Sequence, residues 1–250
     1  MDMRHRHAWA ALLILFLTAG CAAGTTGVPK RDAATARAMT ADAEQLLERH
    51  LAARGGDELR RLIRRAEGML LIPSAGEFGF LVTLGGGSGV LLANTDDGWT
   101  GPVFMGRGAL GWGWQAGGYS QSGIVLFMHE KDVRYVLETG FIFQGQARLV
   151  VFSADEEYGR SPEFRNEGDV YFIVSRTGLF AGVSIDTGGY SNRPGLNAAF
   201  TGVAGGDPET VLYKAKARPE AAARLRGLIG NAALFGAPEK EKDGTEAPSQ

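Results

Sequence analysis

Between residues 33 and 67 the apolar positions recur at the spacing of amphipathic helices. The first run, 33–53, is rich in Ala, Glu, Arg and Leu and predicts a helix that Gly55 and Gly56 end. A second helix is predicted over 58–67, with Asp57 as its N-cap and Gly68 as its stop. The apolar positions of the first helix are Met39, Ala43, Leu46, Leu47 and Leu51.

From residue 69 onward the pattern changes to short apolar or alternating runs that are typical of β-strands. Turn residues separate most of these runs, and the clearest turn is Thr95-Asp96-Asp97-Gly98, in which Asp-Gly favours a tight hairpin. The predicted strands are 69–72, 78–84, 88–93, 103–105, 111–119, 124–128, 147–152, 170–175 and 179–185.

Three further helices are predicted at 131–140, near 208–215 and at 219–230. The chain contains 37 glycines in 250 residues, against a typical ~7%. Many alternate along the predicted strands, as at Gly85, Gly87 and Gly89, so they share one strand face. This favours strong curvature or close approach of another layer over a ligand cradle. We therefore predict an α+β fold: N-terminal helices packed on a strongly curved, glycine-rich antiparallel β-sheet, with a C-terminal helix.

The N-terminus has the layout of a secretory signal: a basic start, an uncharged apolar run over 8–19 and small residues before Cys21. The run is too short to span a bilayer as a helix, which takes roughly 20 apolar residues. Leu17-Thr18-Ala19-Gly20-Cys21 resembles a bacterial lipoprotein lipobox. The resemblance implies a diacylglyceryl group on the Cys21 sulfur, cleavage before Cys21 and fatty acylation, typically with palmitate, of the new amine. The alternative is an ordinary signal peptide with a stray cysteine.

These features predict four segments. Residues 1–20 form a lipoprotein signal peptide, 21–32 a flexible tether, 33–236 the folded domain and 237–250 a disordered tail rich in Pro, Lys, Glu and Ser. With one cysteine, no internal disulfide is possible. The formal net charge is −2, and −3 once residues 1–20, with two arginines and one aspartate, are removed. Such a balance gives no general attraction to nucleic acid.

Candidate catalytic chemistry is sparse. Gly106–Gly111 fits G-x-G-x-x-G by letter, but a strand-like rather than a helical sequence follows it. Only His50 and His129 follow the signal segment, and no G-x-S-x-G elbow occurs. The acids at 96–97 and 155–157 suit solvated turns better than a metal site. We expect no cofactor, no metal ion and no enzyme activity, although a carboxylate-based hydrolase stays open because carboxylate separation cannot be seen in a sequence.

The second predicted helix has two different faces. One face is apolar and the opposite face is basic, as in helices that lie on membrane surfaces and bind lipid headgroups. The alternative is a core-packed helix with a solvated arginine face. The apolar face comprises Leu59, Leu62, Ile63 and Ala66, and the basic face comprises Arg60, Arg61, Arg64 and Arg65.

Several segments in order resemble the SYLF domain family of lipid-binding proteins, over about 46–228. They are 58–73 (ELRRLIRRAEGMLLIP), 77–92 (EFGFLVTLGGGSGVLL), 98–104 (GWTGPVF), 178–185 (GLFAGVSI) and 197–202 (NAAFTG). The resemblance implies a single α+β domain whose eukaryotic relatives bind phosphoinositide membranes, some also binding actin, and it offers no catalytic residues. This chain departs from many relatives at 148–158, where a glycine-rich strand is usual.

We therefore expect a lipid-anchored protein that binds phospholipid or another amphiphile at the bacterial envelope. Arg60, Arg61, Arg64 and Arg65 are its predicted headgroup-binding residues. Ala22 after Cys21 favours the outer membrane, facing the periplasm, by the general lipoprotein sorting pattern. One alternative is a structural or scaffold lipoprotein that binds another envelope protein through an exposed sheet edge, and another is the carboxylate-based hydrolase.

Overall fold

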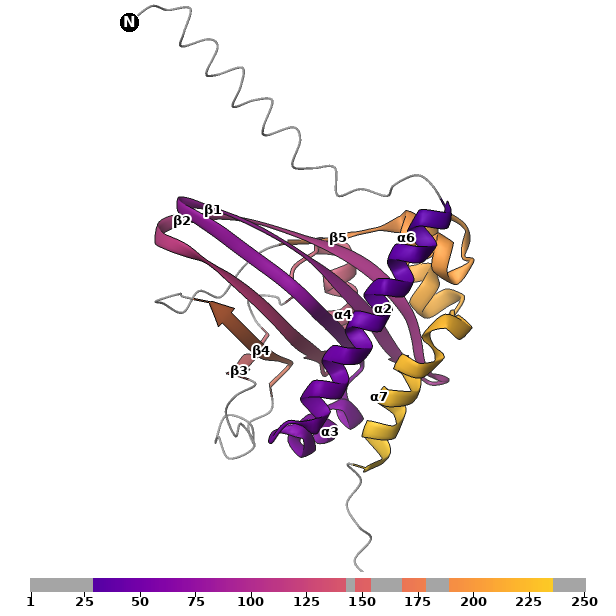
Figure 1. Cartoon of the computed structure of the whole chain (residues 1–250). Helices are drawn as coiled ribbons and strands as arrows, with labels where there is room; N and C mark the ends of the chain where they lie inside the picture. The colour runs from indigo at the N-terminus through magenta and orange to yellow at the C-terminus, as the bar shows by residue number, and fades with distance from the viewer. Residues whose placement is uncertain (1–28, 143–146, 154–167, 179–188, 236–250) are drawn as a thin grey trace, which may run out of the picture.

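Two long antiparallel strands dominate the computed structural model, which describes residues 29–142, 147–153, 168–178 and 189–235 (Figure 1). Strand β1 runs over Gly68–Thr95 and β2 over Gly98–Phe127, and Thr95 pairs with Gly98 across the predicted Asp-Gly turn. The hairpin prediction is confirmed, but the six short strands predicted between 69 and 128 are wrong as separate elements. Pro73 does not end β1 because it falls at a register irregularity between Ile72 and Ala75, where no ladder hydrogen bond is required of it.

The remaining strands extend the sheet in the order β1-β2-β4-β3, and β5 pairs with residues 105–108 in the first part of β2. Strand β4 (Val170–Gly178) is antiparallel to β2, whereas β3 (Leu149–Ser153) is parallel to β4. The strands predicted at 147–152 and 170–175 are therefore confirmed, and β3 is an exception to the predicted antiparallel pairing. Strand β5 (Gly189–Asn192) was not predicted, and the predicted strand 179–185 lies outside the described residues.

The helices largely follow the sequence pattern. Helix α2 (Pro29–Ala52) begins inside the segment predicted as a tether, with proline in the first turn, where its missing N–H costs nothing. Helix α3 runs over Gly56–Arg65, and its N-cap is Gly55. The prediction of Asp57 as the N-cap is therefore wrong, because Asp57 already lies in the first turn, where its charge complements the helix dipole.

The other helical segments include three that the sequence predicted. Helix α4 (Glu130–Thr139) ends at Gly140, whose positive φ of 79° gives a left-handed cap. The chain is helical again at η3 (Thr210–Lys214) and, after η4 (Glu220–Ala222), in α7 (Ala223–Phe235). Helix α6 (Pro194–Thr201) and the short turn η2 (Ala204–Gly206) were not predicted.

The sheet separates two hydrophobic clusters, and β1 supplies both by period-two alternation. Met69 and Leu71 belong to the cluster under α2, α3, α6 and α7, whereas Leu70 and Ile72 belong to the cluster with α4 and η3. Figure 1 shows α2 crossing the sheet and α3 at the lower end of the molecule, beside the C-terminal end of α7. The predicted arrangement of N-terminal helices packed on a sheet, with a C-terminal helix, is confirmed.

Two of the alternating glycines allow close packing. A Cβ atom at Gly89 would lie 2.8 Å from Leu70 Cδ1, and one at Gly87 would lie 2.8 Å from the Cβ of Ala75. At Gly108, by contrast, a Cβ would meet nothing within 4 Å. Leu70 and Ala75 belong to β1 itself, so Gly87 and Gly89 lie where two parts of this one long strand come close together, and no separate layer is involved. Packing does not explain Gly108.

Candidate functional site

Helix α3 is anchored by its apolar face. Leu59, Leu62 and Ile63 are at most 2% exposed and belong to the cluster that includes Leu225 and Ile229 of α7. The helix is therefore core-packed, as the alternative interpretation had it, and its apolar face is not available to a bilayer. Only the arginine face is left to meet a ligand.

The four arginines of α3 fall into two pairs. The Arg60 guanidinium lies 3.1 Å from an Asp57 carboxylate oxygen, and that of Arg61 lies 3.7 Å from a Glu58 oxygen. Both are surface ion pairs one helical turn apart, which hold their partners weakly. Arg64 and Arg65 are exposed, and in the part of the chain that the structure describes neither forms an ion pair.

Two further arginines join this end of the molecule, and the sequence reasoning missed them. Arg49 lies in the last turn of α2, and Arg54 lies in the turn before α3; both are exposed and have no ion-pair partner among the described residues. Residues 49–65 contain six arginines and two acids, Asp57 and Glu58, which gives this segment a formal charge of +4. The formal net charge of the whole chain is −2. A charge count over this window would have revealed them. We call the set the arginine surface: Arg49, Arg54, Arg60, Arg61, Arg64 and Arg65.

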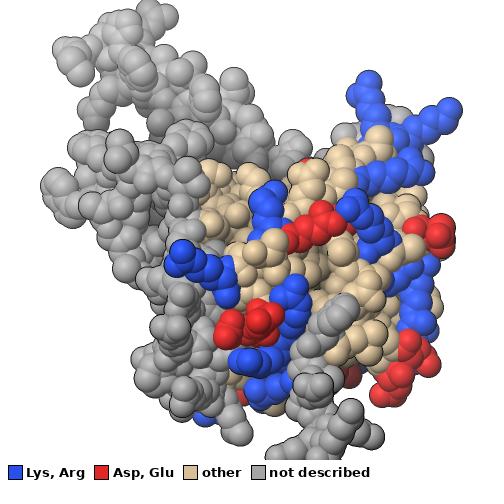
Figure 2. Space-filling model, turned by 60° about the horizontal axis from the view of Figure 1, so that its bottom comes forward, with Lys and Arg blue, Asp and Glu red and all other residues tan. Residues whose placement is uncertain are grey.

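The nearest acids of α2 are already paired. Arg224, in the first turn of α7, lies 3.3 Å from a Glu44 oxygen and 2.6 Å from a Glu48 oxygen. Burial raises the pKa of Glu44, and Arg224 opposes that rise. Figure 2 views the molecule with its lower end brought forward, and basic side chains spread over this face with smaller acidic areas between them. Because Glu44 and Glu48 are neutralised locally, they cancel little of the field of the arginine surface.

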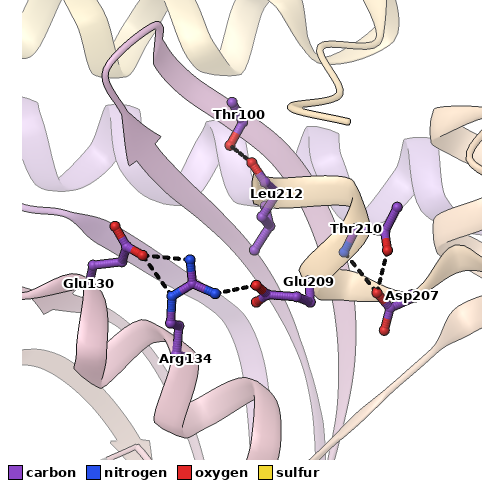
Figure 3. Close-up of polar contacts among 7 residues, drawn as sticks. All are labelled: Thr100, Glu130, Arg134, Asp207, Glu209, Thr210 and Leu212. Carbon is purple, nitrogen blue, oxygen red and sulfur yellow. Dashed lines mark hydrogen bonds and ion pairs between the residues drawn. The ribbon is translucent and has the colours of Figure 1, made fainter. Parts of the chain in front are cut away.

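A second arginine environment lies on the other side of the sheet (Figure 3). Arg134 of α4 donates to Glu130 at 2.6 Å and to Glu209, and its guanidinium lies 4.1 Å from the centre of the Tyr213 ring. This contact joins α4 to the segment around η3. That segment is also held by Thr100, whose hydroxyl donates to the Leu212 carbonyl at 2.9 Å.

Two carboxylates that interact electrostatically, those of Asp132 and Asp169, lie near His129. Its Nε2 lies 3.2 Å from Asp169, whose other oxygen accepts from the Arg148 backbone N–H at 2.8 Å. These bonds lower the pKa of Asp169, whereas burial raises the pKa of the neighbouring Asp132. The contacts tie the end of β2 to the starts of β3 and β4. They account for His129 as a strand-end residue that begins α4, one of the roles the sequence allows.

Several predicted features lie beyond these sites. Cys21 and the acids at 155–157 fall outside the described residues, so lipidation of Cys21 stays a prediction. None of the helices that the structure describes combines the length and the apolar character needed to cross a bilayer. Among the same residues, no group of three or more His, Cys, Asp and Glu side chains is placed to hold a metal ion.

Comparison with known proteins decides the family. The model of the Ysc84 family, described as "Las17-binding protein actin regulator", matches residues 108–232, half of the chain. The chain belongs to the Ysc84 family. This confirms the family resemblance drawn from the sequence. The matched range begins within β2, at residue 108, and ends within α7, at residue 232; it does not include the arginine surface, so it bears on the fold and not on that site.

Individual relatives support the same family assignment. The chain is 31% identical over 173 residues to "SH3 domain-containing YSC84-like protein 1" of Xenopus laevis, covering 67% of this chain and 50% of the relative. It is 28% identical over 141 residues to the protein of the same name from Homo sapiens, covering 56% and 41%. The chain thus spans half or less of the length of these two relatives.

Proposed function

We propose that this Ysc84-family chain is a lipid-anchored envelope protein whose domain binds anionic phospholipid headgroups through the arginine surface. The observation that carries the proposal is the local surplus of four positive charges over residues 49–65. Four of the six guanidiniums, those of Arg49, Arg54, Arg64 and Arg65, have no ion-pair partner in the described residues.

Arginine side chains are well suited to bind the phosphate groups of lipids. A guanidinium presents a planar fork of donors that matches phosphate oxygens in a bidentate way. Each basic residue close to an anionic membrane contributes about 1 kcal/mol of attraction. Because Leu59, Leu62 and Ile63 lock α3 into the core, the backbone of the site is ordered before a ligand arrives. Binding then costs little beyond the ordering of the arginine side chains.

The predicted lipid anchor at Cys21 bears on what headgroup binding by the arginine surface would contribute. A diacylglyceryl group on Cys21, with a further acyl chain on its amine, would hold the protein to a membrane without help from the domain. The arginine surface would then select the headgroup and set the orientation of the domain. We further propose, from Ala22, that the membrane is the outer membrane and that the domain faces the periplasm. The proposed role is binding and not catalysis.

A scaffold role is the second candidate, and one observation favours it. Strand β3 has β4 as its only neighbour within the described ranges, and Val151 on β3 is 44% exposed. A strand with one free edge can pair with an extended segment of another protein. If the scaffold role is correct, the chain should bind an envelope protein, and that binding should not depend on the charge of the lipids.

The test is flotation of the full chain, carrying Cys21→Ser to prevent lipidation, with phosphatidylcholine vesicles that contain or lack phosphatidylglycerol. Every variant keeps the apolar segment 8–19, so differences between variants isolate the domain. We expect Arg64→Glu/Arg65→Glu to abolish the preference for phosphatidylglycerol, and added salt to weaken it. The matched control is Arg31→Glu/Arg37→Glu, which changes the charge equally at exposed positions near the other end of α2.

The proposal fails if wild type shows no preference for phosphatidylglycerol, or if the two double reversals weaken that preference equally. Equal weakening would mean that net charge alone, and not the arginine surface, attracts the chain to anionic lipid.

A further inference from the structure

One large apolar side chain at this end of the molecule points into water. Leu234, in the last turn of α7, is 74% exposed, more than either of the other exposed large apolar residues of the described chain, Phe141 and Val151. The same helix buries Leu225, Ile229 and Ala232 almost completely. Leu234 follows Ala232 by two residues, which on a helix places it roughly opposite that buried position.

Leu234 lies at the same end of the molecule as the arginine surface. Helices α3 and α7 pack against each other, and their buried side chains belong to one cluster. Figure 1 shows the C-terminal end of α7 beside α3 at the lower end of the molecule. The exposed side of α7 and the arginine face of α3 both point away from the core that the two helices share.

We propose that Leu234 inserts into the acyl boundary of an anionic bilayer when the arginine surface docks on its headgroups. This inference rests on the proposed function and adds the depth and orientation of docking. Arginine stems keep their charged ends at phosphate level while apolar groups reach deeper. The surplus positive charge of residues 49–65 selects an anionic lipid surface as the occupant, because a purely apolar partner would leave these guanidiniums desolvated and unpaired.

The test uses an environment-sensitive fluorophore attached to a single cysteine. The chain has one cysteine, so Cys21→Ser leaves none, and Leu234→Cys creates one labelling site. The matched control is Phe141→Cys, which is 47% exposed and follows α4 on the other face of the sheet. We expect vesicles containing phosphatidylglycerol to shift the emission of the label at position 234 to the blue and to leave the label at 141 unchanged.

Substitutions at position 234 measure how much Leu234 contributes to the affinity for anionic vesicles. Leu234→Ser should weaken binding to the anionic vesicles by about tenfold, the effect of withdrawing one partly inserted leucine, and Leu234→Met should retain it. The exposure of Leu234 means that neither change should alter stability.

Failure of this inference can be told apart from failure of the proposed function. If Arg64→Glu/Arg65→Glu abolishes the preference for anionic vesicles while the label at 234 does not shift and Leu234→Ser binds as wild type does, insertion is overturned and headgroup binding stands. If wild type shows no preference for anionic vesicles, both are overturned. A blue shift at both 234 and 141 also overturns the inference, because docking would then not be oriented.

Discussion

The two arginine environments of this domain differ in the supply of nearby carboxylates. Arg134 lies between Glu130 and Glu209, with Tyr213 against its guanidinium, and it connects two segments that are distant in sequence. Arg64 and Arg65 sit on a helix locked into the core, yet no carboxylate in the described chain pairs with them. The same residue type therefore stabilises the fold in one place and stays available to a ligand in the other.

Removing the support of the arginine surface should have the largest effect on stability. Leu62 is 2% exposed, and Leu62→Ala should lower the free energy of unfolding by about 2–5 kcal/mol, because it leaves a cavity under α3. Chemical denaturation measures this loss. The control is Leu234→Ala on α7, which should change stability little because Leu234 is exposed. An unaltered midpoint for Leu62→Ala would show that α3 is not held by its apolar face.

Breaking the paired arginine environment should cost less. Arg134→Ala should lower the free energy of unfolding by about 1–2 kcal/mol, since it removes two partly exposed ion pairs and a cation–π contact. Its vesicle affinity should match that of wild type. Reduced affinity for anionic vesicles in an otherwise folded Arg134→Ala protein would remove the contrast between the two environments.

The carboxylates near His129 should have a smaller effect on stability, and this effect should depend on pH. The pKa of Asp169 is lowered by its hydrogen bonds in the folded state, so its contribution to stability is present above about pH 4 and is lost as pH falls through the folded pKa. The pKa of Asp132 is raised by burial, so its effect has the opposite sign: stability falls as pH rises from about 4 through that raised pKa.

At neutral pH, Asp169→Asn should therefore destabilise the protein by about 1 kcal/mol, and Asp132→Asn should leave stability unchanged or increase it. Denaturation curves of both variants across acidic pH give the comparison. Destabilisation of equal size in both would contradict the opposite signs.

The smallest expected effect on stability is at the arginine surface itself. Arg64→Ala/Arg65→Ala should change the free energy of unfolding by no more than about 0.5 kcal/mol, because both side chains are exposed and unpaired in the described structure. The same variant should bind anionic vesicles ~30-fold more weakly, the loss of two contributions of about 1 kcal/mol. A large loss of stability would mean that these arginines serve the fold.

Local pattern predicted much of this architecture. The two faces of α3, the Asp-Gly hairpin and the glycine that ends α4 all follow from residues within a few positions of one another. The continuity of β1 and β2 did not, because strand pairing across the hairpin carries the chain through Pro73 and through glycine-rich runs that locally favour turns. Helix α6 was missed for a similar reason, since Asn197, which suits a loop, is buried and accepts from the Phe104 backbone N–H at 2.7 Å.

The candidate site was predicted in part. The arginines of α3 could be predicted from helical spacing, whereas Arg49 and Arg54 lie outside that helix and appear only in a charge count over the wider window 49–65. The distant partners of Arg134 and Arg224 could not be predicted from the sequence, because Glu209 and Glu48 are 75 and 176 positions away from them. Sequence shows which residues carry charge, and tertiary structure decides which of those charges are already neutralised.

In the proposed function, the arginine surface meets anionic headgroups and the paired arginine environment around Arg134 does not. The most direct measurement is nuclear magnetic resonance of the arginine side-chain Nε–H groups during titration of the Cys21→Ser chain with short-chain phosphatidylglycerol. We expect shifts at the arginines of residues 49–65 and none at Arg134. Shifts centred elsewhere, or equal shifts with short-chain phosphatidylcholine, would contradict it.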